Sequence, residues 1–196
     1  MGLKSYHLKE GFEAGCDEAG RGCLAGPVVA AAVILDPKKN NSELNDSKKL
    51  SEKQRNVLRS WIEENALAWS VSFVDEKKID EINILHASLL GMHLALDQLN
   101  HHFDRILVDG NKFNPYKNLA HYCMVKGDAR FKSIAAASIL AKTHRDEFML
   151  RLHSSYPKYG WNQNKGYPTK LHRMAIKKFG SNVHHRKSFR LLSDQL

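Results

Sequence analysis

The run Pro27–Leu35 (PVVAAAVIL) constrains the fold of this chain more than any other segment, because it is apolar on both faces. A strand with one face in solvent alternates apolar and polar residues, whereas a strand covered by helices on both sides does not. We therefore expect a central strand here, with helices on both faces of its sheet. The run is too short to span a bilayer, which takes about 20 residues in a helix.

Further strands are expected on either side of this run. Gly11–Asp17 precedes it and is joined to it by the glycine-rich turn Ala19–Gly26, which suggests an antiparallel pair. Later strand candidates are Ala66–Val74, Arg105–Asp109 and His121–Val125. Strands mixed with helices predict an α/β fold, a sheet flanked by helices.

Three helices are expected between these strands. Ser51 and Gln54 form a capping box, and a helix to about Glu64 should follow. A second helix is predicted by apolar residues at spacings of four and three, namely Leu85, Leu89, Met92, Leu96 and Leu99. A third should open at Asp128 and run to about Leu152 before Pro157, with Ala135, Ile139 and Leu140 facing inward.

The C-terminal part differs in composition from the rest of the chain. Residues 158–190 are rich in Lys, Arg, His and aromatic residues, with short helical patterns at Thr169–Phe179 and near Ser188. We expect an α/β core over residues 1–156 and a basic helical extension over residues 157–196 packed on it, as one domain overall.

The charge balance favours a polyanionic partner. Thirty Lys and Arg against 21 Asp and Glu give a formal net charge of +9. The first ten residues, MGLKSYHLKE, lack the apolar stretch of a signal peptide. Cys16, Cys23 and Cys123 have no metal-ligand spacing and fit thiols in a reducing compartment, so we expect a cytoplasmic protein without membrane contact.

Four acidic residues are candidates for chemistry: Asp17, Glu18, Asp109 and Asp128. Each lies where a predicted strand stops or a predicted helix starts. Oxygen ligands without nearby Cys or His suit Mg²⁺ or Mn²⁺. If the four converge, each close pair repels by about 4 kcal/mol at an effective dielectric near 20. Two divalent cations would remove that repulsion and could assist in-line phosphodiester attack.

Each acid also has a structural alternative. Asp109-Gly110 is a common turn pair, and Asp128 could simply cap a helix. Asp17 and Glu18 are neighbours, and neighbours on a regular strand point to opposite faces. Both could serve one site only if the strand has ended or bulged there. Spacing alone leaves these alternatives open.

Eight sequence blocks, in order along the chain, closely resemble the ribonuclease HII family. They are DEAGRGCLAGPVVAAAVIL at Asp17–Leu35, NDSKKLS at Asn45–Ser51, EINILHAS at Glu81–Ser88, VDGN at Val108–Asn111, KGD at Lys126–Asp128, AAASILAKTHRD at Ala135–Asp146, KGYPT at Lys165–Thr169 and HHRKSF at His184–Phe189. Together they cover essentially the whole chain, which is a far stronger signal than any short motif.

The resemblance implies a fold, an activity and a metal site. The fold is the ribonuclease H fold, with a central mixed sheet and a C-terminal helical extension. The activity is hydrolysis on the 5′ side of ribonucleotides in RNA/DNA hybrids, or of single ribonucleotides in duplex DNA, leaving 3′-hydroxyl and 5′-phosphate ends. The family's metal-binding acids match Asp17, Glu18, Asp109 and Asp128, with two Mg²⁺ or Mn²⁺ ions as cofactors. Ribonucleotide excision and primer removal are the roles implied.

The resemblance also implies substrate contacts. The loop Gly20-Arg21-Gly22 would read the 2′-hydroxyl, the group that distinguishes RNA from DNA, through a closely approaching backbone. Tyr167 would stack on the deoxyribose after the ribonucleotide. Phosphate contacts are expected from Lys48, Lys49, Lys165, Lys170 and Arg186. A tight turn, a packing tyrosine and solvated charges are the structural alternatives.

Other classes of protein fit the sequence less well. The sister type, ribonuclease HIII, normally has an extra N-terminal domain and lacks the arginine found here as Arg21. A non-catalytic nucleic-acid-binding protein would not need four acids facing a polyanion, and a two-metal exonuclease would need a strand end. The pairs His101-His102 and His184-His185 are not expected to chelate a metal. We expect a monomer, and Phe189–Leu196 is a candidate segment for binding a sliding clamp.

Overall fold

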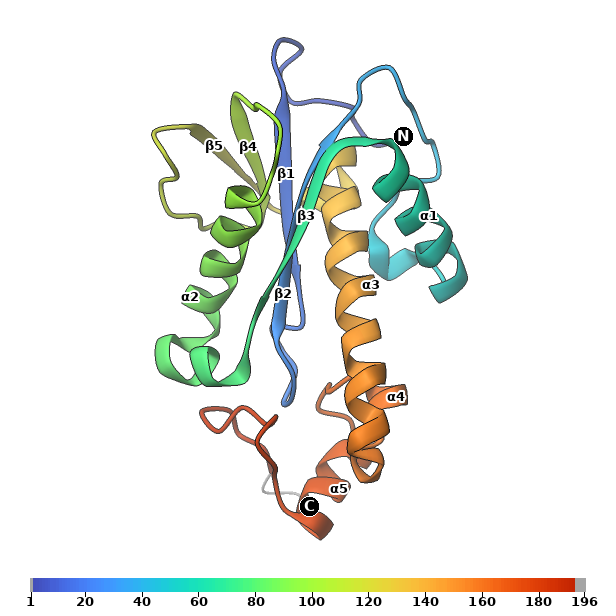
Figure 1. The fold of residues 1–196 in the computed structure, drawn as a ribbon, viewed down its shortest axis with the longest axis vertical. Coiled ribbons are helices and arrows are strands. Elements are labelled where there is room, and N and C mark those ends of the chain that lie inside the picture. The colour runs from blue at the N-terminus through green and yellow to red at the C-terminus, as the bar shows by residue number, and fades with distance from the viewer. Residues whose placement is uncertain (1, 193–196) are drawn as a thin grey trace.

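A five-stranded mixed sheet forms the centre of the protein, seen in a computed structural model that describes residues 2–192 (Figure 1). The strand order is β3-β2-β1-β4-β5; the β1–β2 and β2–β3 pairs are antiparallel, and the β1–β4 and β4–β5 pairs are parallel. The strands are β1 (Glu13–Ala19), β2 (Val28–Leu35), β3 (Ala66–Val74), β4 (Arg105–Asp109) and β5 (Ala120–Met124). The predicted α/β class and mixed sheet are confirmed.

Helices cover both faces of the sheet, with α2 on one side and α1 and α3 on the other (Figure 1). The helices are α1 (Glu52–Asn65), α2 (Glu76–Asp97), α3 (Lys132–Ser155), α4 (Trp161–Asn164) and α5 (Lys170–Phe179). Short 3-10 turns are η1 (Ser47–Lys49), η2 (Gly127–Ala129) and η3 (Pro157–Tyr159). In the described part of the chain, no helix is both long enough and apolar enough to cross a membrane.

The apolar strand β2 is buried on both faces, as predicted. Ala30, Ala32 and Ile34 pack with Met92 and Leu96 of α2. Alternate residues of β2, Ala31 and Val33, pack instead with α1 and α3. Burial on both sides explains why the strand carries no polar residue.

Several helices and strands lie where local sequence patterns predicted them. The Ser51–Gln54 capping box is present and opens α1 at Glu52, and Ala66–Val74 is a strand over the predicted range. The predicted inward residues of α3, namely Ala135, Ile139 and Leu140, are fully buried. Thr169 caps α5, which ends at Phe179.

Three expectations about element ends were wrong. The first strand does not stop at Asp17 but continues to Ala19. The long helix does not open at Asp128: Lys126 has a left-handed backbone (φ 56°), η2 follows, and α3 begins only at Lys132. No helix forms near Ser188, whose N–H and hydroxyl bond instead to the Asp80 carboxylate.

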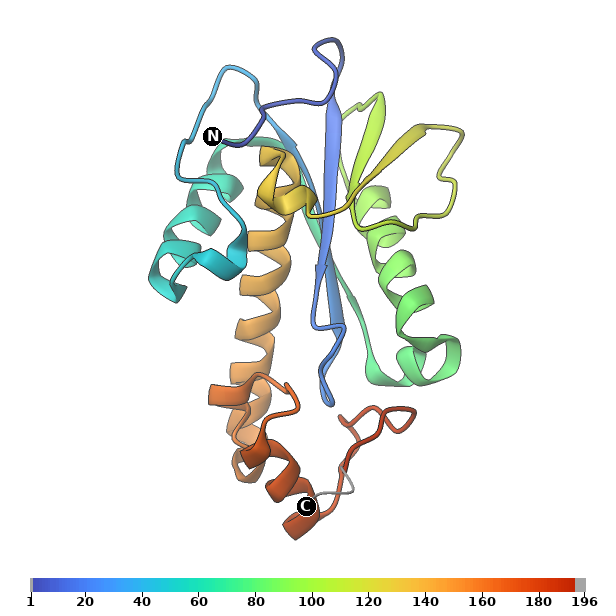
Figure 2. The same cartoon turned by 180° about the vertical axis from the view of Figure 1, so that it is seen from behind.

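The C-terminal segments fold back beneath the end of the sheet, close to the connection between β1 and β2 (Figure 2). Trp161 of α4 and Ile176 of α5 share an apolar cluster with Leu24 and Ala25 of that connection and with Met149 of α3. This shared cluster places the C-terminal extension beside the glycine-rich turn.

Candidate active site

The four predicted acids come together where β1, β4 and η2 meet. Asp17 and Glu18 lie near the end of β1, Asp109 is the last residue of β4, and Asp128 lies in η2. Asp109 interacts electrostatically with each of the other three acids, and Asp17 interacts with Glu18. Asp109 is held in place because its Oδ1 accepts the Gly127 N–H at 2.7 Å.

Asp17 and Glu18 share this region without a break or bulge in their strand. Both remain in regular register with β2, Asp17 opposite Ala31 and Glu18 opposite Ala30. Pairing of β1 with β4 ends one residue earlier, at Cys16 opposite Val108. β4 ends at Asp109, so Glu18 lies beyond the part of β1 that pairs with β4. β1 thus neither ends nor bulges at Asp17 and Glu18, and a shared site for the two carboxylates stays a prediction.

The electrostatics of the cluster show uncompensated negative charge. Burial raises the pKa of Asp17 well above its ordinary value, and repulsion from Glu18 and Asp109 raises it further. Burial also raises the pKa of Asp109, and that of Glu18 against the opposing effect of Arg21. Carboxylates in this state bind protons or cations readily.

Two cationic side chains already lie against the acids. Lys48 Nζ is 3.0 Å from Asp128 Oδ2, and an Arg21 guanidinium nitrogen is 3.3 Å from Glu18 Oε1. Among residues 2–192, no three His, Cys, Asp or Glu side chains are arranged to hold a metal ion as they stand. The donor set nevertheless fits hard divalent cations, because four carboxylates, two of them buried and two half-buried, face only two positive groups. Ligation requires the carboxylates to turn toward a shared point.

The Gly20-Arg21-Gly22 loop and Tyr167 are neighbours across the chain. Leu24 N–H donates to the Gly166 carbonyl at 2.8 Å, which joins the β1–β2 connection to the Lys165–Tyr167 segment. The Arg21 side chain is half exposed, and a Cβ added at Gly22 would meet open space. Tyr167 is 37% exposed, and its ring lies beside the Lys142 and Arg145 cations.

The predicted phosphate-binding residues separate into two groups. Lys48, Lys49 and Lys170 are exposed, and the half-buried Lys165 donates its ammonium to the Asn162 carbonyl. Arg186 does not fit the prediction, because it is fully buried and its guanidinium donates to the carbonyls of Gly26 and Arg21. Burial lowers the pKa of Arg186 to about 10.

Sequence reasoning missed Arg145, a second fully buried arginine next to the same loop. Its guanidinium donates to the carbonyls of Pro27, Ala25 and Lys165. The residue lay inside the block AKTHRD, but no local pattern distinguishes a buried arginine on a helix from a solvated one.

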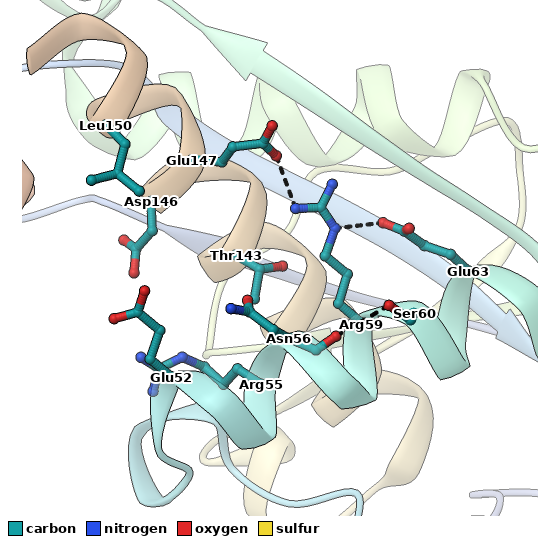
Figure 3. A pocket seen from close by; sticks show the side chains of 10 residues that line it. All are labelled: Glu52, Arg55, Asn56, Arg59, Ser60, Glu63, Thr143, Asp146, Glu147 and Leu150. Carbon is teal, nitrogen blue, oxygen red and sulfur yellow. Dashed lines mark hydrogen bonds and ion pairs between the residues drawn. The ribbon is translucent and has the colours of Figure 1, made fainter. Parts of the chain in front are cut away.

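A cavity of about 410 Å³ between α1 and α3 is separate from the four acids (Figure 3). Arg59 crosses it and pairs with Glu63 at 2.7 Å and Glu147 at 2.9 Å. Arg59, Glu63 and Glu147 pair with one another, and none of the four acids lines the cavity.

Similarity to known proteins identifies the family of this chain. A family model described as ribonuclease HII matches residues 14–192. The chain belongs to the ribonuclease HII family. Its ribonuclease HII relative from Christiangramia forsetii is 61% identical over 93% of this chain and 92% of the relative. That from Bacteroides thetaiotaomicron is 58% identical over 98% of this chain and 96% of the relative.

Solved structures agree with this assignment. The ribonuclease H2 of Pyrococcus horikoshii superposes with a TM-score of 0.76 at 28% identity, covering 92% of this chain and 94% of that one. The ribonuclease HII of Archaeoglobus fulgidus, solved in complex with PCNA, gives 0.77 at 25% identity over 93% and 96%. Bst-RNase HIII in complex with Mn²⁺ shares the fold, with 0.69 at 19% identity over 92% and 67%. The expected ribonuclease H fold is confirmed. As a member of the ribonuclease HII family, the chain is an endonuclease of the ribonuclease H class.

Proposed function

We propose that the protein hydrolyses the phosphodiester on the 5′ side of ribonucleotides, in RNA/DNA hybrids and at single ribonucleotides within duplex DNA. The products are 3′-hydroxyl and 5′-phosphate ends, because water and not the substrate's 2′-hydroxyl is the nucleophile. The observation that carries the proposal is the convergence of four carboxylates around Asp109. Ribonucleotide excision from DNA and primer removal are the tasks that this activity serves.

Asp17, Glu18, Asp109 and Asp128 are the residues proposed to hold two divalent cations, Mg²⁺ or Mn²⁺. When bound, such a pair activates water and stabilises the leaving oxygen in an in-line displacement. The proposal is supported by the raised pKa values of Asp17 and Asp109, which reflect burial and mutual repulsion. Bst-RNase HIII, a fold neighbour, has been solved with Mn²⁺.

Substrate selection is proposed to rest on the Gly20–Gly22 loop and Tyr167. Glycines let the loop backbone approach the ribose, where its polar groups can bond to the 2′-hydroxyl. A site whose polar groups need that hydroxyl could reject an all-DNA duplex by about 10⁴–10⁵-fold. Tyr167, a partly exposed residue, would stack on the following deoxyribose. Lys48, Lys49, Lys165 and Lys170 would contact phosphates without reading sequence.

The proposal is tested with end-labelled duplex DNA carrying one internal ribonucleotide, incubated with Mg²⁺ or Mn²⁺. We expect one cut on the 5′ side of the ribonucleotide and none in all-DNA duplex. Asp109→Asn should abolish the cut, whereas Asp36→Asn, an acid outside the cluster, should leave it. An uncut substrate with both metals would contradict the proposed activity, and cutting only from strand ends would indicate an exonuclease.

A sliding clamp is a proposed partner of the monomer. The Archaeoglobus fulgidus ribonuclease HII was solved with PCNA. Our candidate segment, Phe189–Leu196, is described only to residue 192, and residues 193–196 lie outside the described part. Deleting residues 189–196 should abolish co-elution with a purified clamp if this segment carries the contact, and retained co-elution would refute it.

A further inference from the structure

The loop from Gly20 to Pro27 lies between two segments far along the chain. On one side, Leu24 N–H donates to the Gly166 carbonyl at 2.8 Å. On the other, Gly26 N–H donates to the His184 carbonyl at 2.9 Å, and Arg186 N–H donates to the Leu24 carbonyl at 2.9 Å. The loop's shape is therefore set by tertiary contacts and not by a local turn alone.

Arg145 of α3 lies beneath the loop and joins it to the Tyr167 segment. The side chain is fully buried. Its Nε donates to the Pro27 carbonyl at 3.0 Å, and its two terminal nitrogens donate to Ala25 at 3.1 Å and Lys165 at 2.8 Å. Its guanidinium carbon is also 5.7 Å from the centre of the Tyr167 ring. One side chain thus joins the Gly20–Pro27 loop to the segment that holds Tyr167.

Arg186 holds the opposite side of the same loop. It is also fully buried, and it donates to the Gly26 carbonyl from Nε at 3.0 Å and from a terminal nitrogen at 2.8 Å. Its other terminal nitrogen donates to the carbonyl of Arg21 at 2.9 Å. Arg21 is the central residue of the Gly20–Gly22 loop, so this bond fixes the peptide proposed to face the ribose.

The acceptors of both guanidinium groups are main-chain carbonyls, and within residues 2–192 neither group forms an ion pair with a carboxylate. Burying a charge in this way is costly unless its hydrogen bonds are satisfied. A planar guanidinium fork can satisfy several carbonyls of an irregular loop at once, which an ammonium cannot. The carbonyls turn inward, while the N–H groups of Arg21 and Gly22 have no acceptor in the described part of the chain.

We propose that Arg145 and Arg186 are positioning residues for ribonucleotide recognition: they fix the Gly20–Gly22 peptides and the Tyr167 segment relative to each other. This inference rests on the proposed function. Neither arginine bonds to the four acids, so both act on substrate selection and not on metal binding. The fit at Gly20 is close, because an added Cβ would lie 2.0 Å from Arg145 Nε.

The test uses Arg145→Lys and Arg186→Lys, which keep the charge and lose the planar fork, with Arg151→Lys, an exposed arginine on the same helix, as control. Binding to a duplex with one ribonucleotide and to an all-DNA duplex is compared on the Asp109→Asn background, so that nothing is cut. We expect both variants to lose the preference for the ribonucleotide duplex at least tenfold. Affinity for all-DNA duplex should stay within twofold, and the control should match the parent.

A second readout does not depend on substrate. Amide hydrogen exchange at Leu24 and Gly26, whose N–H groups donate to the carbonyls of Gly166 and His184, should be at least tenfold faster in both variants, with β1 and β4 unchanged. Calorimetric Mn²⁺ affinity with the four acids unsubstituted should stay within twofold. If a lysine variant does not fold, the glutamine variant at the same position replaces it, because a neutral amide still donates to carbonyls.

The outcomes separate the two proposals. If both variants fold and keep the parent's preference and loop exchange, the positioning role is refuted and the arginines serve stability alone. If the parent shows no preference for a ribonucleotide, the proposed substrate selection fails. Faster exchange confined to Leu24 and Gly26 then still supports the part of the inference that concerns loop geometry.

Discussion

At the scale of single residues, the clustered acids that are proposed to bind cations also lower the stability of the fold, because they repel one another. Burial and neighbouring carboxylates raise the pKa of Asp17, and burial raises that of Asp109. A carboxyl with a raised folded pKa holds its proton more tightly in the folded state than in the unfolded chain. Stability contributed by that proton is present at low pH and is lost as pH rises from about 4 through the raised folded pKa.

We therefore predict that Asp109→Asn stabilises the protein in the absence of divalent cations. The substitution removes one charge from the repulsive group, and about 1 kcal/mol raises Tm by about 2–4 °C in a chain of this size. The gain should be present at pH 8 and shrink as the pH falls and the carboxyl groups with raised pKa values, Asp17 and Asp109, take up protons. Thermal melts in EDTA measure it, with Asp36→Asn as control. A variant less stable than wild type at pH 8 would argue against repulsion in the cluster.

The buried histidines give a pH dependence of the opposite sign. His185 Nε2 is 3.3 Å from His172 Nε2, and its Nδ1 accepts the Asn182 N–H at 3.0 Å. Burial, followed by the neighbouring His172, lowers the pKa of His185 to about 4. The unfolded chain binds this proton near pH 6.5, so stability is full above pH 6.5 and is lost as pH falls toward 4.

Replacing His185 with glutamine should remove part of that acid sensitivity. We expect the Tm of the wild type to fall about 3–6 °C more than that of His185→Gln between pH 7 and pH 4.5, since each kcal/mol corresponds to about 2–4 °C. His86→Gln, at an exposed histidine on α2, is the matched control. Parallel Tm curves for wild type and His185→Gln would mean that His185 does not carry the effect.

At the scale of elements, sequence reasoning succeeded where a local signal was complete. The Ser51–Gln54 box gave the start of α1 because capping involves residues three apart. The end of β1 and the start of α3 were misplaced because both depend on distant partners. Glu18 stays in the ladder through pairing with Ala30 of β2, and Asp128 lies in a turn set by the left-handed Lys126.

The same limit applies to the site. The four acids could be chosen from motifs and turns, and the Gly20–Gly22 loop from its resemblance. Burial of Arg145 and Arg186 could not be predicted, because their carbonyl acceptors come from segments about 20 to 165 residues away in the chain. A side chain's solvent exposure is a property of the packed elements, and charged residues are exposed by default.

The packing of β1 against α3 gives an element-scale prediction. A Cβ at Gly15 would lie 2.3 Å from the Ser133 carbonyl carbon and 2.6 Å from the Ile134 nitrogen, both backbone atoms. Gly15→Ala should therefore push α3 away from β1 and cost about 1–3 kcal/mol of unfolding free energy. Cleavage should also fall, because Asp17 lies two residues further along β1.

Urea unfolding at fixed temperature measures this cost. Gly22→Ala is the control for stability, since a Cβ at Gly22 meets no atom within 4 Å. Equal unfolding free energies for Gly15→Ala and wild type would show that β1 and α3 can separate without loss.

At the scale of the whole molecule, a net charge of +9 coexists with an acidic centre. The acids would repel a phosphate backbone unless cations occupy them, so attraction must come from lysines and arginines elsewhere. Lys165 and Lys170 lie in the C-terminal segments, beside the loop that holds Tyr167. The loop containing Lys38 lies at the opposite end of the molecule from these segments (Figure 1).

This arrangement predicts that the effect of a lysine substitution on the salt dependence of DNA binding differs with the position of that lysine. Each phosphate contact contributes about −0.9 to the slope of log K against log salt for duplex DNA. Lys170→Gln should therefore reduce the slope for an all-DNA duplex by about 1 and weaken binding equally across sequences. Lys38→Gln changes net charge by the same amount but should leave the slope unchanged, because counterion release follows local phosphate contacts. Fluorescence anisotropy of Asp109→Asn protein over a series of salt concentrations measures both slopes. If the two lysine variants shift the slope equally, total charge attracts the duplex, and the C-terminal segments are not its binding surface.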